Sequence, residues 1–263
     1  MKLKIGIAQV DIFLGNPQAN QQTIIDYAQK AGQMGVDVLL YPEMWQTGYA
    51  LTELDRLADQ HGDESQALLS QLAKRHHMNI VGGSVATQRD HQFYNTMFVF
   101  DRYGQKVSEY DKVHLFGLMN EEKYIAAGNH SNVFNLDGVP CAGVCCYDIR
   151  FPEWVRTMMA KGPQELLFVT AEWPEQRIAQ WQTLLQARAI ENQAFVVAAN
   201  RVGYDDDNVF GGRSLVIDPL GKIIKQASDS EPTLLVTEID IDDEQDVRGQ
   251  IPVFSDRRPT LYY

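Results

Sequence analysis

The chain has 263 residues, of which 44% are hydrophobic and 22% are charged, as in an ordinary globular protein. Its formal net charge of -12 argues against a nucleic-acid partner, because phosphate binding requires clustered lysine and arginine side chains. The apolar run at the N-terminus is too short for a signal peptide, and Asp11 interrupts it. No segment approaches the roughly 18 apolar residues of a membrane span, so no membrane partner is expected.

The three cysteines, Cys141, Cys145 and Cys146, lie within one short segment. This crowding does not have the spacing of a disulfide framework, and it favours a reducing, cytoplasmic compartment. The six histidines include the pair His76 and His77 but lack the spacing of a zinc-binding motif. The sequence therefore predicts no metal site.

The N-terminal half predicts alternating strands and helices. The expected strands cover 4–10, 36–41, 79–84, 96–101 and 106–110, and the expected helices cover 17–34 and 65–77. The strand at 36–41 (VDVLLY) is apolar on both faces, which predicts burial under helices on both sides. The last two strands form a hairpin, because a short turn with Gly104 separates them.

The C-terminal half repeats this scheme. A strand at 139–145 leads through a turn into a helix that begins at Pro152, since proline is favoured at the first helical position. Further strands are expected at 166–170, 194–199 and 233–239, with a helix at 175–192, a hairpin around 218–221 and an irregular tail. No low-complexity linker divides the halves. We therefore expect an α/β protein with two sheets packed in one domain, residues 1–263.

Three residues far apart in the chain carry the groups needed to attack an amide carbonyl through sulfur. They are Glu43 in YPEMW, Lys112 in DKVHLF and Cys146 in GVCCYDIRFPEW. Glu43 and Cys146 directly follow apolar runs of strand type, and loops at the carboxyl ends of strands commonly build sites in α/β proteins. Taken singly, each has a structural alternative: a loop carboxylate, a solvated surface lysine and a small core thiol.

The neighbouring cysteines differ in their expected surroundings. Cys145 and Cys146 point to opposite faces of the strand end, so one enters a site while the other packs in the core. A turn from strand to helix presents a nucleophile well. The backbone N–H of Tyr147 is then expected beside the sulfur, where an oxyanion donor is needed.

The segments YPEMWQTGY, YDKVHLF and GVCCYDIRFPE resemble the glutamate, lysine and cysteine motifs of the nitrilase superfamily, the carbon-nitrogen hydrolases. The resemblance runs from Ile5 to about Ile217 and includes AEWP and RAIENQ. Within the superfamily the chain is most similar to the omega-amidases, which hydrolyse 2-oxoglutaramate and related ω-amides of oxo acids. This resemblance implies a four-layer αββα sandwich, catalysis without a metal or organic cofactor, and a homodimer formed through the cysteine-side face.

Carried over by motif position, the resemblance assigns Glu43 as general base, Lys112 as oxyanion stabiliser and Cys146 as nucleophile. Glu121 in NEEKYIAAGN matches a second carboxylate found beside the lysine. Glu122 is an adjacent competitor, and the spacing to the following glycine favours Glu121.

Neighbouring residues are candidates for choosing the substrate. Arg150 follows Cys146 by four residues, and its planar guanidinium suits capture of a substrate carboxylate. The alternative is an internal salt bridge to Asp148 or Glu153. Tyr49 either donates to the same carboxylate or caps its own loop.

The AEWP segment adds two more candidates for substrate binding. Trp173 is expected to form an aromatic wall, with core packing as the alternative. Glu172 is a departure, since several omega-amidases carry asparagine at this position. A carboxylate there would repel or re-aim an anionic substrate. This leaves open a sulfur-containing oxo-acid amide or a substrate with an amino group.

The sequence therefore predicts an amidase that acts on small ω-amides of 2-oxo acids and releases ammonia. Within enzymes, the alternatives are a hydrolase of N-carbamoyl amino acids or polyamines, and a nitrilase. The alternative from another class is a binding scaffold without catalytic activity.

Overall fold

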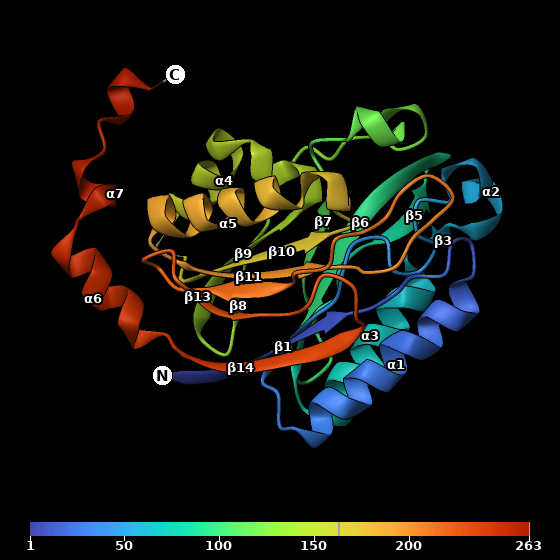
Figure 1. Cartoon of the computed structure of the whole chain (residues 1–263), viewed down its shortest axis with the longest axis horizontal. Helices are drawn as coiled ribbons and strands as arrows, with labels where there is room; N and C mark the ends of the chain where they lie inside the picture. Colours follow the sequence, from blue (N-terminus) through green and yellow to red (C-terminus); the bar gives the residue numbers. More distant parts are fainter. Residues whose placement is uncertain (163, 263) are drawn as a thin grey trace.

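Two β-sheets lie face to face between two outer layers of helices in a computed structural model, which describes residues 1–162 and 164–262 (Figure 1). This arrangement is the expected four-layer αββα sandwich. The second sheet carries the candidate nucleophile, and both sheets contribute to its surroundings.

The first sheet is eight-stranded in the described part of the chain, in the order β14-β1-β2-β4-β6-β5-β3, with β7 paired to β6. Its strands are β1 (Lys2–Gln9), β2 (Val38–Leu40), β3 (Asp59–Gln60), β4 (Asn79–Val81), β5 (Val85–Arg89), β6 (Gln92–Phe100), β7 (Lys106–Asp111) and β14 (Thr233–Asp240). The central strands β1, β2 and β4 are parallel, so their carboxyl ends meet at one edge.

The second sheet is six-stranded over the same residues, in the order β13-β12-β11-β10-β9-β8. Its strands are β8 (Val133–Leu136), β9 (Val139–Cys145), β10 (Leu166–Ala171), β11 (Phe195–Asn200), β12 (Leu215–Ile217) and β13 (Ile223–Gln226). Parallel pairing of β9, β10 and β11 places the chain after Cys145, Ala171 and Asn200 at a common edge.

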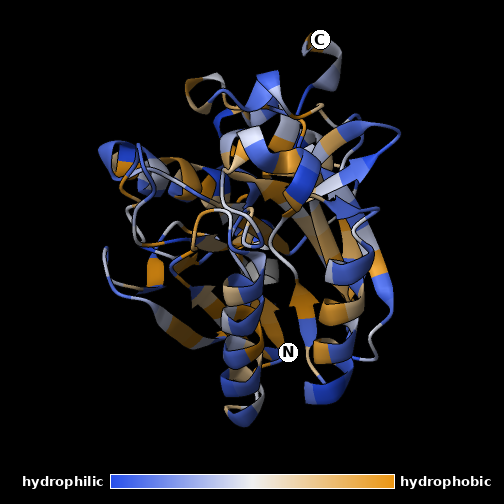
Figure 2. Ribbon diagram, turned by 90° about the vertical axis from the view of Figure 1, so that its right-hand side faces the viewer, coloured by the Kyte–Doolittle hydropathy of each residue, from blue (hydrophilic) through white to orange (hydrophobic). Residues whose placement is uncertain are grey.

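Helices cover the outer face of each sheet, with apolar sides inward and hydrophilic sides outward (Figure 2). The first sheet is covered by α1 (Pro17–Gln33) and α3 (Asp63–His76), and the second by α4 (Pro152–Met159) and α5 (Ile178–Asn192). A short α2 (Leu54–Leu57) packs through Leu54 in the same cluster as Met44 of the loop after β2. No helix in residues 1–162 or 164–262 combines the length and apolar character that a membrane crossing requires.

Side chains alternate along the central strands between two kinds of core. Leu40 points between the sheets, where it joins Phe168 and Val197, whereas Leu39 and Tyr41 pack under α1 and α3. The apolar VDVLLY segment is therefore buried on both faces, as expected. The prediction of helices on both sides is wrong, because the opposite sheet covers the inner face.

The C-terminal tail also differs from its expected irregular structure. It forms α6 (Asp242–Gln250) and α7 (Val253–Asp256) and runs along one side of the sandwich (Figure 1). Gln193 donates to the Ile251 carbonyl at 2.6 Å, and Phe254 packs beside Arg156 of α4. These contacts join segments distant in sequence, so a local pattern did not reveal them.

Candidate active site

Three loops converge from different strands on one buried position. Glu43 lies three residues beyond β2, Lys112 directly follows β7, and Cys146 directly follows β9. All three side chains are at most 5% exposed. The structure thus brings together the three residues that the sequence singled out.

The loop of Glu43 is held rigidly by contacts with the segment after β4. Trp45 donates from Nε1 to the Gly82 carbonyl at 2.8 Å, and the Met44 N–H donates to Ser84 Oγ at 3.0 Å. Gly83 has φ +62°, and a Cβ on it would lie 2.0 Å from the Pro42 carbonyl oxygen. Only glycine permits this close approach.

The Glu43 carboxylate accepts four hydrogen bonds. Oε1 accepts from Tyr49 Oη, Asn95 Nδ2 and Lys112 Nζ, each at 2.9 Å, and Oε2 accepts from the Glu172 backbone N–H at 2.9 Å. Burial alone would raise the pKa of Glu43. The charge of Lys112 and these hydrogen bonds outweigh burial and hold that pKa below its ordinary value.

Lys112 lies between two carboxylates. Its ammonium is 2.9 Å from Glu43 Oε1 and 2.7 Å from Glu121 Oε2, whereas Glu122 is exposed to solvent. Burial would lower the pKa of Lys112, but the charges of Glu121 and Glu43 raise it well above its usual range. The lysine is therefore firmly protonated. Its second carboxylate partner is Glu121, not Glu122.

Glu121 responds differently from Glu43 because fewer partners offset its burial. Asn95 Nδ2 donates to its Oε1 at 3.0 Å, and the Phe116 N–H donates to its Oε2 at 2.8 Å. Burial and the charge of Glu43 raise the pKa of Glu121 although Lys112 opposes them. Glu43, with the lower pKa, is thus the carboxylate better suited to remain ionised beside the thiol.

Cys146 occupies a backbone conformation that is rare for residues other than glycine, with φ +43°. Such strained positions cluster at active sites, where they aim a side chain. Burial raises the pKa of the Cys146 thiol well above its ordinary value, the charge of Glu43 adds to this, and Lys112 opposes it. Cys145 instead packs between the sheets, so the two cysteines diverge as expected.

The turn after Cys146 is clamped by Asp148. Its Oδ2 accepts from the Cys145 N–H at 3.0 Å and from Tyr110 Oη at 2.7 Å. Its Oδ1 accepts from the His114 N–H at 3.0 Å and lies 2.7 Å from His114 Nδ1. Asp148 thereby ties the cysteine turn to the segment that carries Lys112.

A small pocket opens beside the thiol. It is lined by Phe116, Cys146, Tyr147, Arg150, Glu172, Trp173, Pro174 and Arg177. Two arginines at one small cavity provide a positive environment for an anionic group.

Arg150 does not form the internal salt bridge considered as its alternative. No ion pair joins it to Asp148 or Glu153 in the described part of the chain. Its guanidinium donates to Gln180 Oε1 at 2.6 Å and lies 4.7 Å from the centre of the Trp173 ring. Burial and the nearby charge of Arg177 lower the pKa of Arg150.

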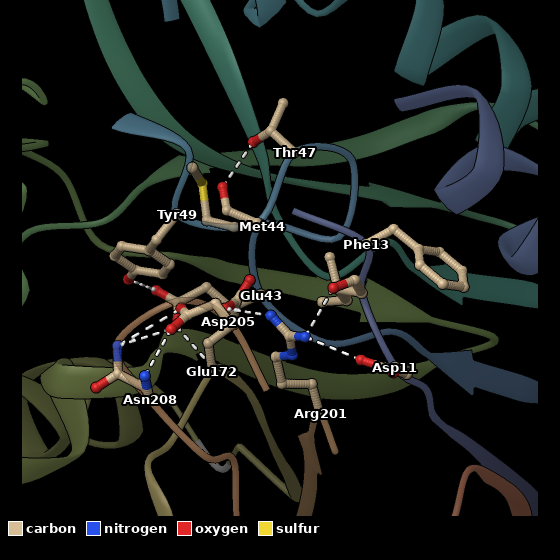
Figure 3. A network of polar contacts seen from close by, with 12 residues as sticks. Asp11, Phe13, Glu43, Met44, Thr47, Tyr49, Glu172, Arg201, Asp205 and Asn208 are labelled. Carbon is tan, nitrogen blue, oxygen red and sulfur yellow. Dashed lines mark hydrogen bonds and ion pairs between the residues drawn. The ribbon is translucent and has the colours of Figure 1, made fainter. Parts of the chain in front are cut away.

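Glu172 is buried and is held by a second network (Figure 3). Arg201 Nη1 donates to Glu172 Oε2 at 3.1 Å, and Arg201 Nη2 donates to Asp11 Oδ1 at 3.0 Å. Burial raises the pKa of Glu172 to about 8, Arg201 opposes this, and the charge of Glu43 reinforces it. A fixed negative charge repelling an anionic substrate, as expected from the sequence, is therefore not the state favoured at neutral pH.

Tyr49 and Trp173 occupy more specific places than the sequence indicated. The single hydroxyl hydrogen of Tyr49 is donated to Glu43, so in this structure Tyr49 supports the glutamate instead of facing a substrate carboxylate. Trp173 both lines the cavity and packs on Trp181, with ring centres 5.5 Å apart.

Three residues of the site were not singled out from the sequence. Asn95 bridges Glu43 and Glu121, Arg201 holds Glu172, and Arg177 lines the cavity. Arg177 carried a usable signal, because it lies four residues beyond Trp173 in the same segment. Asn95 and Arg201 had none, since each is an isolated polar residue near a strand.

Comparison with known proteins places this geometry in a family. The sequence pattern of the carbon-nitrogen hydrolases matches residues 4–249. The chain belongs to the carbon-nitrogen hydrolase family. It is 46% identical, over the whole of both chains, to a 2-oxoglutaramate amidase of Bacillus subtilis. It is 34% identical to an omega-amidase of Yersinia enterocolitica, covering 97% of this chain and 96% of the relative.

A solved carbon-nitrogen hydrolase superfamily protein of Xanthomonas campestris, with an arsenic adduct in its active site, shares this fold. Its structure superposes with a TM-score of 0.92 at 29% identity and covers 98% of each chain. The similarity therefore extends over both sheets and their loops.

Proposed function

We propose that this protein hydrolyses small ω-amides of 2-oxo acids, of the 2-oxoglutaramate type, to the acid and ammonia through a thioester on Cys146. One observation carries the proposal: a buried thiol beside Glu43 and Lys112 opens onto a small cavity with Arg150 and Arg177 in its wall. The relatives named as 2-oxoglutaramate amidase and omega-amidase support this substrate class.

The first half of the reaction forms the thioester. Glu43 takes the thiol proton as the sulfur of Cys146 bonds to the amide carbon, so no resting thiolate is needed. Lys112 and the Tyr147 N–H stabilise the oxyanion of the tetrahedral intermediate. Collapse of that intermediate breaks the C–N bond, and Glu43 returns the proton to the departing ammonia.

The second half releases the acid. Glu43 removes a proton from water as the water oxygen bonds to the thioester carbon, and the same donors stabilise the second oxyanion. Collapse breaks the C–S bond, and the sulfur of Cys146 regains a proton from Glu43. Glu121 keeps the Lys112 ammonium in place through its 2.7 Å contact.

The cavity wall selects the substrate. Arg150 and Arg177 bind the carboxylate remote from the amide, and Trp173 forms an apolar wall against the carbon chain. Two cationic side chains disfavour a polyamine substrate, which is itself positively charged.

The test is ammonia release from 2-oxoglutaramate, succinamate, glutamine, a carbamoyl amino acid and a simple nitrile. We expect preference for the first two and survival of that activity in the presence of a chelator. Cys146→Ala should abolish release, whereas Cys145→Ala, the matched control in the inter-sheet core, should retain it. Equal release by Cys146→Ala and the parent, or activity confined to carbamoyl or nitrile substrates, contradicts the proposal.

We infer further that the protein works as a cytoplasmic homodimer on a small molecule. The three buried free cysteines suit a reducing compartment, and the net charge of -12 disfavours nucleic acid. Light scattering of the purified protein should give about twice the chain mass of 29.8 kDa, and a monomer mass would contradict the dimer.

A further inference from the structure

Glu172 carries a buried oxygen that the protein itself leaves without a partner. The residue is 1% exposed, and its Oε2 accepts from Arg201 at 3.1 Å. Its Oε1 has no hydrogen-bond partner among residues 1–162 and 164–262. Buried polar atoms are nearly always paired, because leaving one unpaired is costly. An unpaired atom on a residue that lines a cavity therefore points to a group supplied from outside.

The position of this oxygen is fixed by its surroundings. The Glu172 N–H donates to Glu43 Oε2, and Glu172 is one of the residues that line the cavity beside Cys146. Arg201 is itself held by Asp11 Oδ1 at 3.0 Å and by the Ile12 carbonyl at 2.7 Å (Figure 3). Glu172 therefore cannot turn away to find water without breaking its hydrogen bond from Arg201.

Glu172 is suited to donate a hydrogen bond at neutral pH. Its pKa of about 8 keeps the carboxyl largely protonated, and the proton belongs on Oε1 because Oε2 accepts from Arg201. The charged or titratable groups that surround it are Arg201, Glu43, Asp205, Tyr49, Cys146, Arg150 and Arg177. A neutral acid with a free O–H needs an acceptor on the ligand.

We propose that Glu172 determines specificity by donating a hydrogen bond from Oε1 to the 2-oxo oxygen of the substrate. This inference rests on the proposed function. Under that function the amide oxygen is bound by Lys112 and the Tyr147 N–H, and the carboxylate by the arginines. The 2-oxo oxygen is the acceptor that remains. An α-ammonium in its place, as in glutamine, cannot accept this hydrogen bond.

The test compares 2-oxoglutaramate with glutaramate, which has a methylene in place of the 2-oxo group. We expect the parent protein to prefer 2-oxoglutaramate about tenfold or more in kcat/KM. Glu172→Met should reduce this ratio toward one. Glu172→Gln should keep most of it, because the amide can accept from Arg201 and donate to the substrate. Glu175→Gln, an exposed neighbour outside the cavity wall, serves as the matched control and should keep the full ratio.

A pH series on the parent protein tests the same hydrogen bond without relying on the folding of a variant. Glu172→Gln serves only as its control. The ratio should fall above pH 8, where the carboxylate can no longer donate, and should stay constant in Glu172→Gln. Dividing kcat/KM for 2-oxoglutaramate by kcat/KM for glutaramate cancels the pH dependence that Cys146 and Glu43 impose on both substrates.

Three results would overturn the inference: a parent ratio near one, a Glu172→Met variant that keeps the parent ratio, or a parent that prefers glutamine to 2-oxoglutaramate. Failure of the proposed function is distinguishable, since the parent would then hydrolyse no ω-amide at all. In that case the inference falls with it.

Discussion

The inner charge cluster of Glu43, Lys112 and Glu121 and the rim of Arg150, Trp173 and Arg177 are built differently. Each charged group of the inner cluster is almost fully buried and has several hydrogen-bond partners within the protein. The two rim guanidiniums are partly exposed, and Arg150 keeps only Gln180 as a side-chain hydrogen-bond partner among the described residues. The inner cluster is thus fixed before the substrate arrives, whereas the rim arginines keep N–H groups free to bind the substrate.

This difference suits the inner cluster to the bond-breaking chemistry and the rim to the choice of substrate. Preorganised charges stabilise a developing oxyanion without reorganising during the reaction. Partly solvated arginines instead gain their partner only when a carboxylate enters. Changes in the inner cluster should therefore lower kcat for every substrate, and changes at the rim should act according to substrate charge.

The largest effect is expected from Lys112→Met. Loss of the ammonium removes the proposed oxyanion donor and leaves two buried carboxylates facing each other without their shared cation. We expect kcat to fall by roughly 10²–10³-fold or more and the free energy of unfolding to fall by about 3–5 kcal/mol. Ammonia release and urea denaturation measure the two effects separately.

The double variant Lys112→Met/Glu121→Gln is the control for this prediction. Removing one carboxylate should restore part of the lost stability but none of the activity, because the oxyanion donor is still missing. A recovery of activity together with stability would show that Lys112 acts only through folding.

Glu172 lies where the two regions meet, and its protonation should be visible in stability alone. Its pKa is about 8 in the folded protein and near 4.3 in an unfolded chain. Between these values the folded protein holds a proton that the unfolded chain has lost. Stability from this group is therefore complete below the unfolded pKa and is lost as pH rises to 8. The slope is at most about 1.4 kcal/mol per pH unit.

Glu172→Gln removes this titration and leaves the other groups in place. Urea denaturation at several pH values between 5 and 8 should show the parent losing stability relative to Glu172→Gln as pH rises. If the free energies of unfolding of the parent and of Glu172→Gln change in parallel between pH 5 and 8, Glu172 is ionised over this range. The conclusion that Glu172 is neutral in the folded protein would then be wrong.

How much of this site the sequence could predict depends on how local each signal is. Glu43, Lys112 and Cys146 stand in contiguous motifs next to strands, so their convergence was predictable. Glu172 is recognisable in the sequence as a departure, yet its neutral state depends on burial and on the charge of Glu43, which lies 129 residues earlier in the chain.

The fold was predicted to a similar extent. Long periodic segments such as α1 and the strand β10 were found close to their observed bounds. The short strands β3 and β8 were missed, since a few residues give little periodicity and these strands exist through pairing with distant partners. The helical tail likewise depends on contacts that no local pattern encodes.

At the rim, Arg150→Ala should act mainly on substrates with a carboxylate. Loss of a charge-assisted contact should raise KM for succinamate about 10–100-fold. The loss should be at least tenfold smaller for butyramide, which has no carboxylate. Arg56→Ala, at an arginine 67% exposed, is the control and should leave both substrates unchanged. Equal KM increases for succinamate and butyramide would mean that Arg150 maintains the structure of the site and does not bind the carboxylate.

Arg177→Ala is expected to have the smallest effect. The Arg177 guanidinium lies 5.8 Å from the centre of the Phe116 ring, and it contributes charge to the cavity that Cys146 also lines. We expect KM for succinamate to rise about threefold to tenfold, as for a partly solvated charge.

The double variant Arg150→Ala/Arg177→Ala decides whether the rim is one carboxylate site or two separate charges. If both arginines bind the same carboxylate, either single variant removes part of a shared contact, and the combined free-energy change differs from the sum of the two. Additive effects on succinamate would instead mean that Arg177 acts only by long-range attraction. Its effect should then shrink as salt is added, while that of Arg150 persists.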